Sequence, residues 1–257
     1  MGVFYIALET FTLLRRDRVF VPALLTGLFF VIFANLASDW SVSDFTKILF
    51  DSGTFGYRFT GIAVALFWGT KIIGDTRLEG SLETALAAPI SRSAWLAGRF
   101  TGLVLALLAL ALVYLIFWQT FMILTGFPVM TSSQLYVFFL LTLEWIVCGA
   151  IATFFSAFAS NAVALFASIA VVLVGLVSHT ISQTLGPNTS EWLKGVVGGL
   201  AYIWNLQQFN LVDMATQLNG PGIAPSQLVM TSLYGIGIIA VLVSAGCLVF
   251  EKIDAIR

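Results

Sequence analysis

Residues 100–125 read FTGLVLALLALALVYLIFWQTFMILT and contain no Asp, Glu, Lys, Arg or His. The hydrocarbon core of a bilayer is about 30 Å thick, and an α-helix needs roughly 20 apolar residues to cross it. Lipid offers no hydrogen-bond partners to the backbone, so a run of this length and composition can only be helical there. The run therefore predicts a transmembrane helix.

The composition of the whole chain agrees with this prediction. Of its 257 residues, 59% are hydrophobic and 10% are charged, and the mean hydropathy is +0.99. That is more apolar surface than a soluble domain of this length can bury. Lys and Arg (12) nearly balance Asp and Glu (13) without a basic run, which argues against a nucleic-acid partner. Cys148 and Cys247 lie in apolar stretches and are expected to be buried thiols.

Further apolar runs on both sides of residues 100–125 extend the prediction to an all-α integral membrane protein with one domain, residues 1–257. Six spans would place both termini on one side of the membrane. Basic residues then favour the cytoplasm for that side, because nine of them would lie there and three outside. The predicted spans are residues 19–37, 59–74, 100–125, 134–158, 162–178 and 228–250.

Two segments outside these spans are expected to lie at the membrane surface. Residues 4–18 are too short to cross and end in an arginine cluster, which is typical of an interfacial helix. The alternative is a plain extension of the first span. Residues 179–227 form a long outer connection, in which a helix start at Ser190 and Glu191 and a short apolar stretch predict re-entrant or interfacial helices before the last span.

The connection between the second and third spans carries its own helix signals. Thr76, followed three residues later by Glu79, forms a capping-box pattern, so a helix is predicted to begin at Arg77. Pro89 disfavours helical geometry at Ala88 and ends the helix. The expected product is a cytoplasmic helix of about three turns.

The faces of this predicted helix differ in character. Leu78, Leu82 and Leu86 recur every four residues and line one face, while Glu79 and Glu83 lie on a neighbouring face. Like charges at this spacing repel by a few tenths of a kcal/mol, which a basic partner surface would relieve. The pattern favours a docking helix, and the alternative is a loop whose leucines rest on the membrane.

The stretch RLEGSLETALAAPISR at residues 77–92, followed by Gly98 and Arg99, resembles the cytoplasmic signature of ABC-2-type transporter permeases. The layout is similar as well, with an interfacial N-terminal helix ending in Arg-Asp-Arg, six spans and a longer last outer loop. The resemblance implies a permease subunit of an ABC exporter, two of which form the pathway beside two ATPase subunits. It also implies that residues 77–92 form the coupling helix seated on the ATPase, with Arg77, Glu79, Leu82, Glu83, Leu86, Pro89 and Arg92 making or shaping that contact.

The chain contains no G-x-x-x-x-G-K-[ST] phosphate loop, so ATP and Mg²⁺ are expected on a separate subunit, and no catalytic residue, cofactor or metal is expected here. A second copy or a close relative is expected as partner, because one six-helix unit offers half of the pathway implied by the resemblance. Small residues in the predicted fifth span allow close helix approach: Ala162, Ala164, Ala167, Ser168, Ala170 and Gly175.

Three polar side chains lie within or at the ends of the predicted spans. Glu144 lies near the middle of its span, where an ionised acid costs roughly 2.5–3.5 kcal/mol. It is expected either to line a substrate or proton path or to pair with a group across a subunit contact. The alternative is a protonated acid that is hydrogen-bonded to a neighbour such as Thr142 or to a backbone carbonyl. His179, at the outer end of a span, is expected to be interfacial. Arg58 is expected to anchor the second span at the outer interface. The rival functions are a membrane-embedded enzyme using Glu144 with His179, and a structural anchor subunit.

Overall fold

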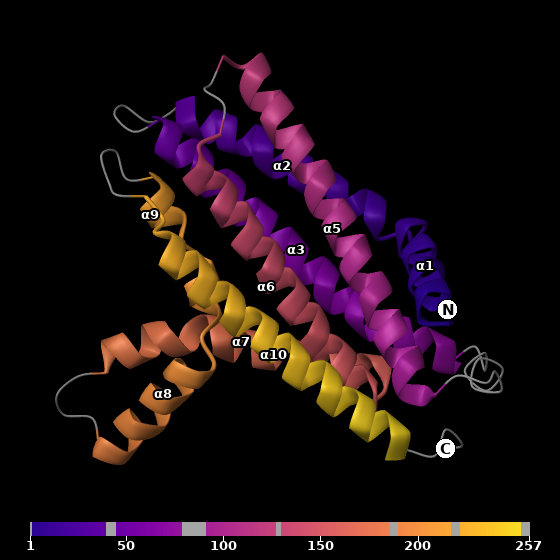
Figure 1. Cartoon of the computed structure of the whole chain (residues 1–257). Helices are drawn as coiled ribbons and strands as arrows, with labels where there is room; N and C mark the ends of the chain where they lie inside the picture. The colour runs from indigo at the N-terminus through magenta and orange to yellow at the C-terminus, as the bar shows by residue number, and fades with distance from the viewer. Residues whose placement is uncertain are drawn as a thin grey trace.

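The computed structural model describes residues 2–39, 45–78, 91–126, 130–185, 190–216 and 222–252 (Figure 1). Within these ranges all regular structure is helical and no strand occurs, which confirms the all-α prediction. The elements are α1 (Gly2–Arg15), α2 (Phe20–Asp39), α3 (Phe45–Leu78), α5 (Arg92–Leu124), α6 (Ser132–Ser156), α7 (Asn161–Thr184), α8 (Glu191–Ile203), the 3₁₀-helix η1 (Leu206–Phe209), α9 (Val212–Thr216) and α10 (Pro225–Lys252).

Four of the described helices are long and apolar enough to cross a membrane: α5, α6, α7 and α10. They correspond to the predicted third to sixth spans. A fifth crossing results if α1 and α2 count as one broken span, since the two helices bend by 61° at the break between them. Helix α3 is not among them, and charged residues such as Lys47, Arg58 and Lys71 are distributed along it. The fold is therefore compatible with a multi-pass membrane protein.

The core is centred on α6, the most completely buried of the four apolar helices, which packs along α3 and also contacts α5, α7 and α10. Aromatic side chains fill the space between α3 and α6: the rings of Tyr57 and Trp145 lie 4.1 Å apart, centre to centre. Gly61 makes this packing possible, because a Cβ atom there would lie 1.6 Å from the Trp145 ring. Dense packing of this kind is what holds membrane helices together in the absence of a hydrophobic driving force.

Helix α1 is a separate element that lies against the first half of α5 (Figure 1). Its inner face is buried through Ile6, Thr10 and Leu14. Gly102 on α5 lets the α1 backbone approach, because an added Cβ would meet the Ala7 carbonyl oxygen at 2.5 Å. The described ends of the chain, at α1 and α10, lie at the end of the bundle where α3 ends and α5 begins (Figure 1).

The structure corrects two predicted boundaries. Helix α3 begins at Phe45, so residues 45–58, which precede the predicted second span at residues 59–74, are helical as well. At its other end α3 continues to Leu78, and the Thr76 hydroxyl donates to the Ile72 carbonyl 3.3 Å away within the same helix. The prediction that a new helix begins at Arg77 is therefore wrong, because Arg77 and Leu78 continue α3.

The remaining predicted coupling residues fall at the edge of, or beyond, the described structure. Residues 79–90 lie outside the described ranges, and with them Glu79, Leu82, Glu83, Leu86 and Pro89. Arg77 belongs to the last turn of α3, and Arg92 is the first residue of α5. The Ser91 hydroxyl caps α5 by accepting from the Ala94 amide at 3.2 Å.

Between α7 and α10 the chain forms short helices, as expected of residues 179–227. Helix α8 begins at Glu191, where the sequence predicts a helix start, and it packs against α7. The C-terminal half of α7 and the N-terminal half of α8 extend away from the other helices in Figure 1. The chain then returns through η1 and α9 to contact α3 and α6.

Candidate functional site

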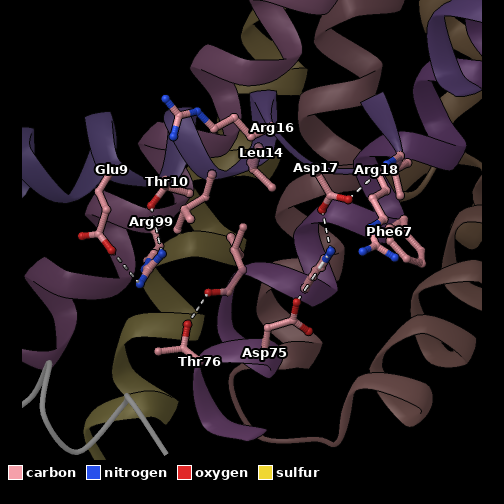
Figure 2. A pocket seen from close by; sticks show the side chains of 14 residues that line it. Glu9, Thr10, Leu14, Arg16, Asp17, Arg18, Phe67, Asp75, Thr76 and Arg99 are labelled. Atoms are coloured by element: carbon pink, nitrogen blue, oxygen red, sulfur yellow. Dashed lines mark hydrogen bonds and ion pairs between the residues drawn. The ribbon is translucent and has the colours of Figure 1, made fainter. Parts of the chain in front are cut away.

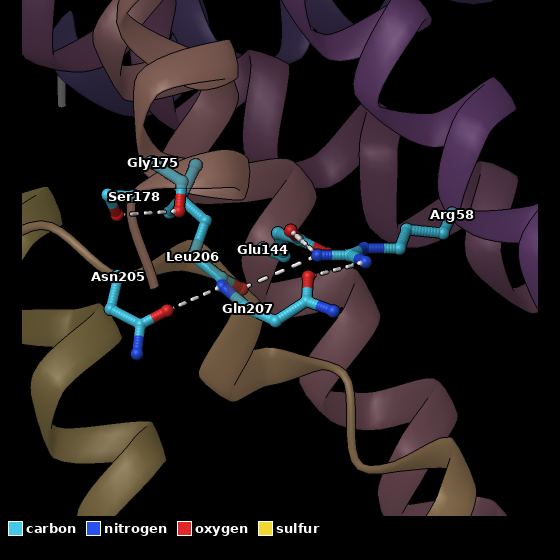
Figure 3. A network of polar contacts seen from close by, with 7 residues as sticks. All are labelled: Arg58, Glu144, Gly175, Ser178, Asn205, Leu206 and Gln207. Carbon is cyan, nitrogen blue, oxygen red and sulfur yellow. Dashed lines mark hydrogen bonds and ion pairs between the residues drawn. The ribbon is translucent and has the colours of Figure 1, made fainter. Parts of the chain in front are cut away.

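A buried ion pair joins α3 to α6 near the middle of both helices (Figure 3). Arg58 Nε donates to Glu144 Oε2 at 2.7 Å, and Arg58 Nη2 donates to Oε1 at 2.6 Å. The Glu144 side chain is fully buried, and that of Arg58 is 14% exposed. The planar guanidinium fork thus holds both carboxylate oxygens, which is the strongest geometry available to such a pair.

The other side of the same guanidinium faces η1. Arg58 Nη1 donates to Gln207 Oε1 at 3.3 Å, and Nη2 approaches the Leu206 carbonyl oxygen at 3.5 Å (Figure 3). Asn205 caps η1, because its side-chain oxygen accepts from the Gln207 amide at 3.0 Å. One arginine therefore connects three segments that are distant in sequence.

Helices α7 and α10 form hydrogen bonds with residues 203–205, which lead into η1. Ser178 on α7 donates to the Trp204 carbonyl at 2.9 Å, and the Trp204 indole donates to the Val171 carbonyl at 3.0 Å. Tyr234 on α10 donates to the Ile203 carbonyl at 2.9 Å and accepts from the Asn205 amide at 3.0 Å. Side chains thereby satisfy the Ile203 and Trp204 carbonyls and the Asn205 amide, which lie where the helical hydrogen-bond pattern is interrupted.

These contacts answer the question left open at Glu144. Its partner is Arg58 of the same chain, whereas Thr142 donates to the Phe138 carbonyl and shares a 2.6 Å hydrogen bond with Tyr57. The prediction of Arg58 as an anchor at the outer interface is wrong, because its side chain turns inward to the carboxylate. Two lone charges of opposite sign in apolar surroundings were the available signal, but 86 residues separate them in sequence.

His179 lies apart from this pair. Its Nε2 atom is 3.5 Å from Gln183 Nε2, on the same helix, and its backbone carbonyl accepts from Ser182. The described contacts therefore do not bring His179 and Glu144 together, as the enzyme hypothesis requires. Among the described residues no group of three potential metal ligands occurs.

A second polar feature is a cavity of about 640 Å³ between α1, the connection at residues 16–19, α3 and α5 (Figure 2). Lys71 Nζ lies 2.6 Å from Asp17 Oδ2 and 3.7 Å from Asp75 Oδ2. Arg99 Nη2 lies 3.6 Å from Glu9 Oε1. The cavity is thus walled by charged side chains from four segments, at the end of the bundle that holds the chain termini.

The last turns of α3, which line this cavity, also contact the turn between α6 and α7. Asn161 Nδ2 donates to Asp75 Oδ1 at 3.3 Å, and the Ser156 hydroxyl donates to the Thr70 carbonyl at 2.8 Å. A side chain at Gly74 would overlap the Asn161 amide, so the glycine permits this approach. Helix α3 therefore connects the cavity and the α6–α7 turn to the buried ion pair.

The chain matches no family model, and no curated protein matches it. Its function is accordingly inferred from the residues and geometry described above.

Proposed function

We propose that the chain is a permease subunit of an ABC-2-like transporter, an exporter, which moves its substrate across the cytoplasmic membrane with ATP hydrolysed by a separate subunit. The supporting observation is the length of the two helices that flank the signature-like residues 77–92. Helix α3 has 34 residues and α5 has 33. At 1.5 Å per residue each is about 50 Å long, well beyond the 30 Å or so that a crossing needs. Both can therefore project from the bilayer at the end where residues 79–90 connect them, within reach of a soluble ATPase.

Six crossings follow if α2 and α3 also span. The charged residues of α3 are an argument against a crossing by this helix. That argument is weakened because Arg58 is paired with Glu144, and Lys71 with Asp17 and Asp75. Paired and hydrogen-bonded charges are the form in which ionisable side chains are tolerated in membranes. The location of both described chain ends at one end of the bundle suits an even number of crossings. The basic-residue bias supports a cytoplasmic location for the termini.

The geometry suggests how a displacement at residues 77–92 would reach the outer segments. Helix α3 runs without a break from Arg58 to Leu78, so movement of its cytoplasmic end would carry Arg58 with it. Arg58 contacts both Glu144 and η1, and would transmit that movement to the short helices before α10. In this proposal α8, η1 and α9 close the outer end of the pathway.

A second copy or a close relative would complete the pathway. Of the four apolar helices, α7 and α10 are the least buried within the chain, and both present apolar side chains outward. Val163 and Phe166 on α7 and Met230 and Leu233 on α10 are among them. Lipid or a second permease would cover these faces.

The experiment that tests the proposal is purification of the tagged chain with its bound partners in mild detergent. We expect a nucleotide-binding subunit to co-purify and its ATPase activity to rise when the permease is present. Changing Glu83 to Lys should leave membrane insertion intact but weaken recruitment, because a base would replace an acid at the proposed contact, where truncating a buried charge costs 2–5 kcal/mol.

Glu191→Lys is the matched control, since Glu191 is an exposed acid at the start of α8. It should recruit the ATPase as the unmodified chain does. The proposal fails if no nucleotide-binding chain co-purifies, or if Glu83→Lys and Glu191→Lys recruit it equally well.

A further inference from the structure

We propose that the cavity between α1, residues 16–19, α3 and α5 binds a phosphate group, that of an anionic phospholipid headgroup. Its volume of about 640 Å³ lies within the roughly 300–1,000 Å³ typical of small-molecule sites. The proposal goes beyond transport and requires only that the chain be embedded in lipid.

The acids that line the cavity already have donors. Asp17 Oδ2 accepts a hydrogen bond from Lys71 Nζ at 2.6 Å, and Asp17 Oδ1 accepts one from the Val19 amide at 3.1 Å. Asp75 lies 3.7 Å from Lys71 and also accepts from the Asn161 side chain. Glu9 Oε1 lies 3.6 Å from Nη2 of Arg99, whose side chain is buried. The carboxylates are thus engaged by neighbouring elements.

Two further arginines lining the cavity stand in contrast. The side chains of Arg16 and Arg18 are exposed, and within the described part of the chain neither takes part in an ion pair. Figure 2 shows them on either side of Asp17. The lining therefore has four cations against three acids, and its uncommitted charges are guanidinium forks, whose geometry matches phosphate oxygens.

The surroundings favour a lipid phosphate over a free one. The outer face of α1 exposes large apolar side chains, with Phe4 65% and Tyr5 68% exposed, while its other face packs on α5. Such a helix is stable in the interfacial layer of a membrane, and Arg16 and Arg18, which follow its last residue, would there meet the phosphates. Apolar side chains also line the cavity itself, among them Leu13 and Phe67, and they suit the glycerol and acyl portions of a lipid.

The site would connect α1 to the last turns of α3, because Lys71, Asp75 and Thr76 line it together with Arg16 and Arg18. A bound headgroup would therefore stabilise the 61° bend between α1 and α2 against α3. The measurable consequence is a higher unfolding temperature with anionic lipid.

The test uses the full chain in detergent, titrated with phosphatidylglycerol or with phosphatidylcholine of the same acyl chains. Bound lipid is counted by native mass spectrometry, and the unfolding temperature is followed in parallel. An arginine near a phosphate surface contributes about fivefold in affinity, so Arg16→Gln with Arg18→Gln should weaken phosphatidylglycerol binding about 30-fold. The control is Arg15→Gln with Lys252→Gln, which removes the same charge outside the cavity lining and should bind normally.

Inorganic phosphate identifies the source of the anion. If it raises the unfolding temperature as much as phosphatidylglycerol does, the site stands and its ligand is free phosphate; if only the lipid does so, the ligand is the headgroup. Asp75→Asn is a second variant that keeps all four cations and should tighten binding. Equal binding of phosphatidylcholine, or equal loss in the control pair, would overturn the proposal. No ATPase is needed, so this result is independent of the test of transport.

Discussion

An ionised acid at the centre of a membrane helix costs roughly 2.5–3.5 kcal/mol on insertion scales, and Glu144 lies near the middle of α6, which is long and apolar enough to cross a membrane. Arg58 offsets that penalty with two short hydrogen bonds, so the two charges are tolerated only as a unit. Burial of the pair need not stabilise the fold relative to an apolar pair of similar volume, because both ions lose their hydration. Its specific contribution is geometric, since it sets the position of α3 relative to α6 and η1.

A double-mutant cycle measures this coupling. Glu144→Leu leaves a buried guanidinium without its counter-ion and should destabilise the folded chain by about 3–5 kcal/mol. Arg58→Met combined with Glu144→Leu removes both charges and should recover most of that loss. Unfolding in detergent, followed by size-exclusion fluorescence, reports the difference. If the effects of the single changes simply add in the double variant, the side chains are not energetically coupled.

Helix η1 shows how a very short element is held in place. Four residues of 3₁₀-helix contain few hydrogen bonds of their own, so the position of η1 depends on side chains from α3, α7 and α10. Gln207 supplies the direct contact to Arg58. Helix α3 illustrates the opposite case, because its 34 residues form one continuous connection between the buried pair and the cavity.

Gln207→Leu should loosen η1 without unfolding the bundle. The change removes one hydrogen bond worth about 1 kcal/mol and leaves the pair between Arg58 and Glu144 intact. Hydrogen exchange should therefore become faster in residues 203–211 and stay unchanged in α3 and α6. Gln183→Leu, an exposed change on α7, serves as the control. Unchanged exchange at residues 203–211 would mean that Gln207 does not restrain η1.

The number of crossings is a property of the whole molecule, and labelling one position between α2 and α3 decides it. If α2 and α3 both span, the connection between them faces the outside; if they do not, it stays on the side of the termini. A cysteine at Ser43, in a chain whose Cys247 is replaced by Ala, should react with a membrane-impermeant maleimide added to intact cells. Cys148 is fully buried and should not interfere.

Ser160→Cys provides the comparison, because this exposed position lies at the turn between α6 and α7, on the proposed cytoplasmic side. It should react only after the cells are opened. Labelling of the Ser43→Cys chain only in opened cells would reduce the crossings to those of the four apolar helices.

Composition and local pattern determined the features that depend on short stretches of chain. The run at residues 100–125 predicted a membrane helix, and α5 is such a candidate, as are α6, α7 and α10 for the runs that follow. Residues 4–18 predicted a separate N-terminal helix, which α1 forms over Gly2–Arg15, and Ser190 with Glu191 predicted the start of α8. These predictions succeeded because helix propensity, hydropathy and capping act over distances of a few residues.

Tertiary structure alone decided the features that depend on contacts between distant residues. Thr76 has the pattern of a helix cap, yet α3 continues past it while its hydroxyl bonds to Ile72. Arg58 has the pattern of an interfacial anchor, yet it pairs with Glu144 across 86 residues and reaches Gln207 across 149. The physical reason is that the free energy of a charge in lipid depends on which opposite charge lies within hydrogen-bond distance, and that is determined by the packing of whole helices and not by their local sequence.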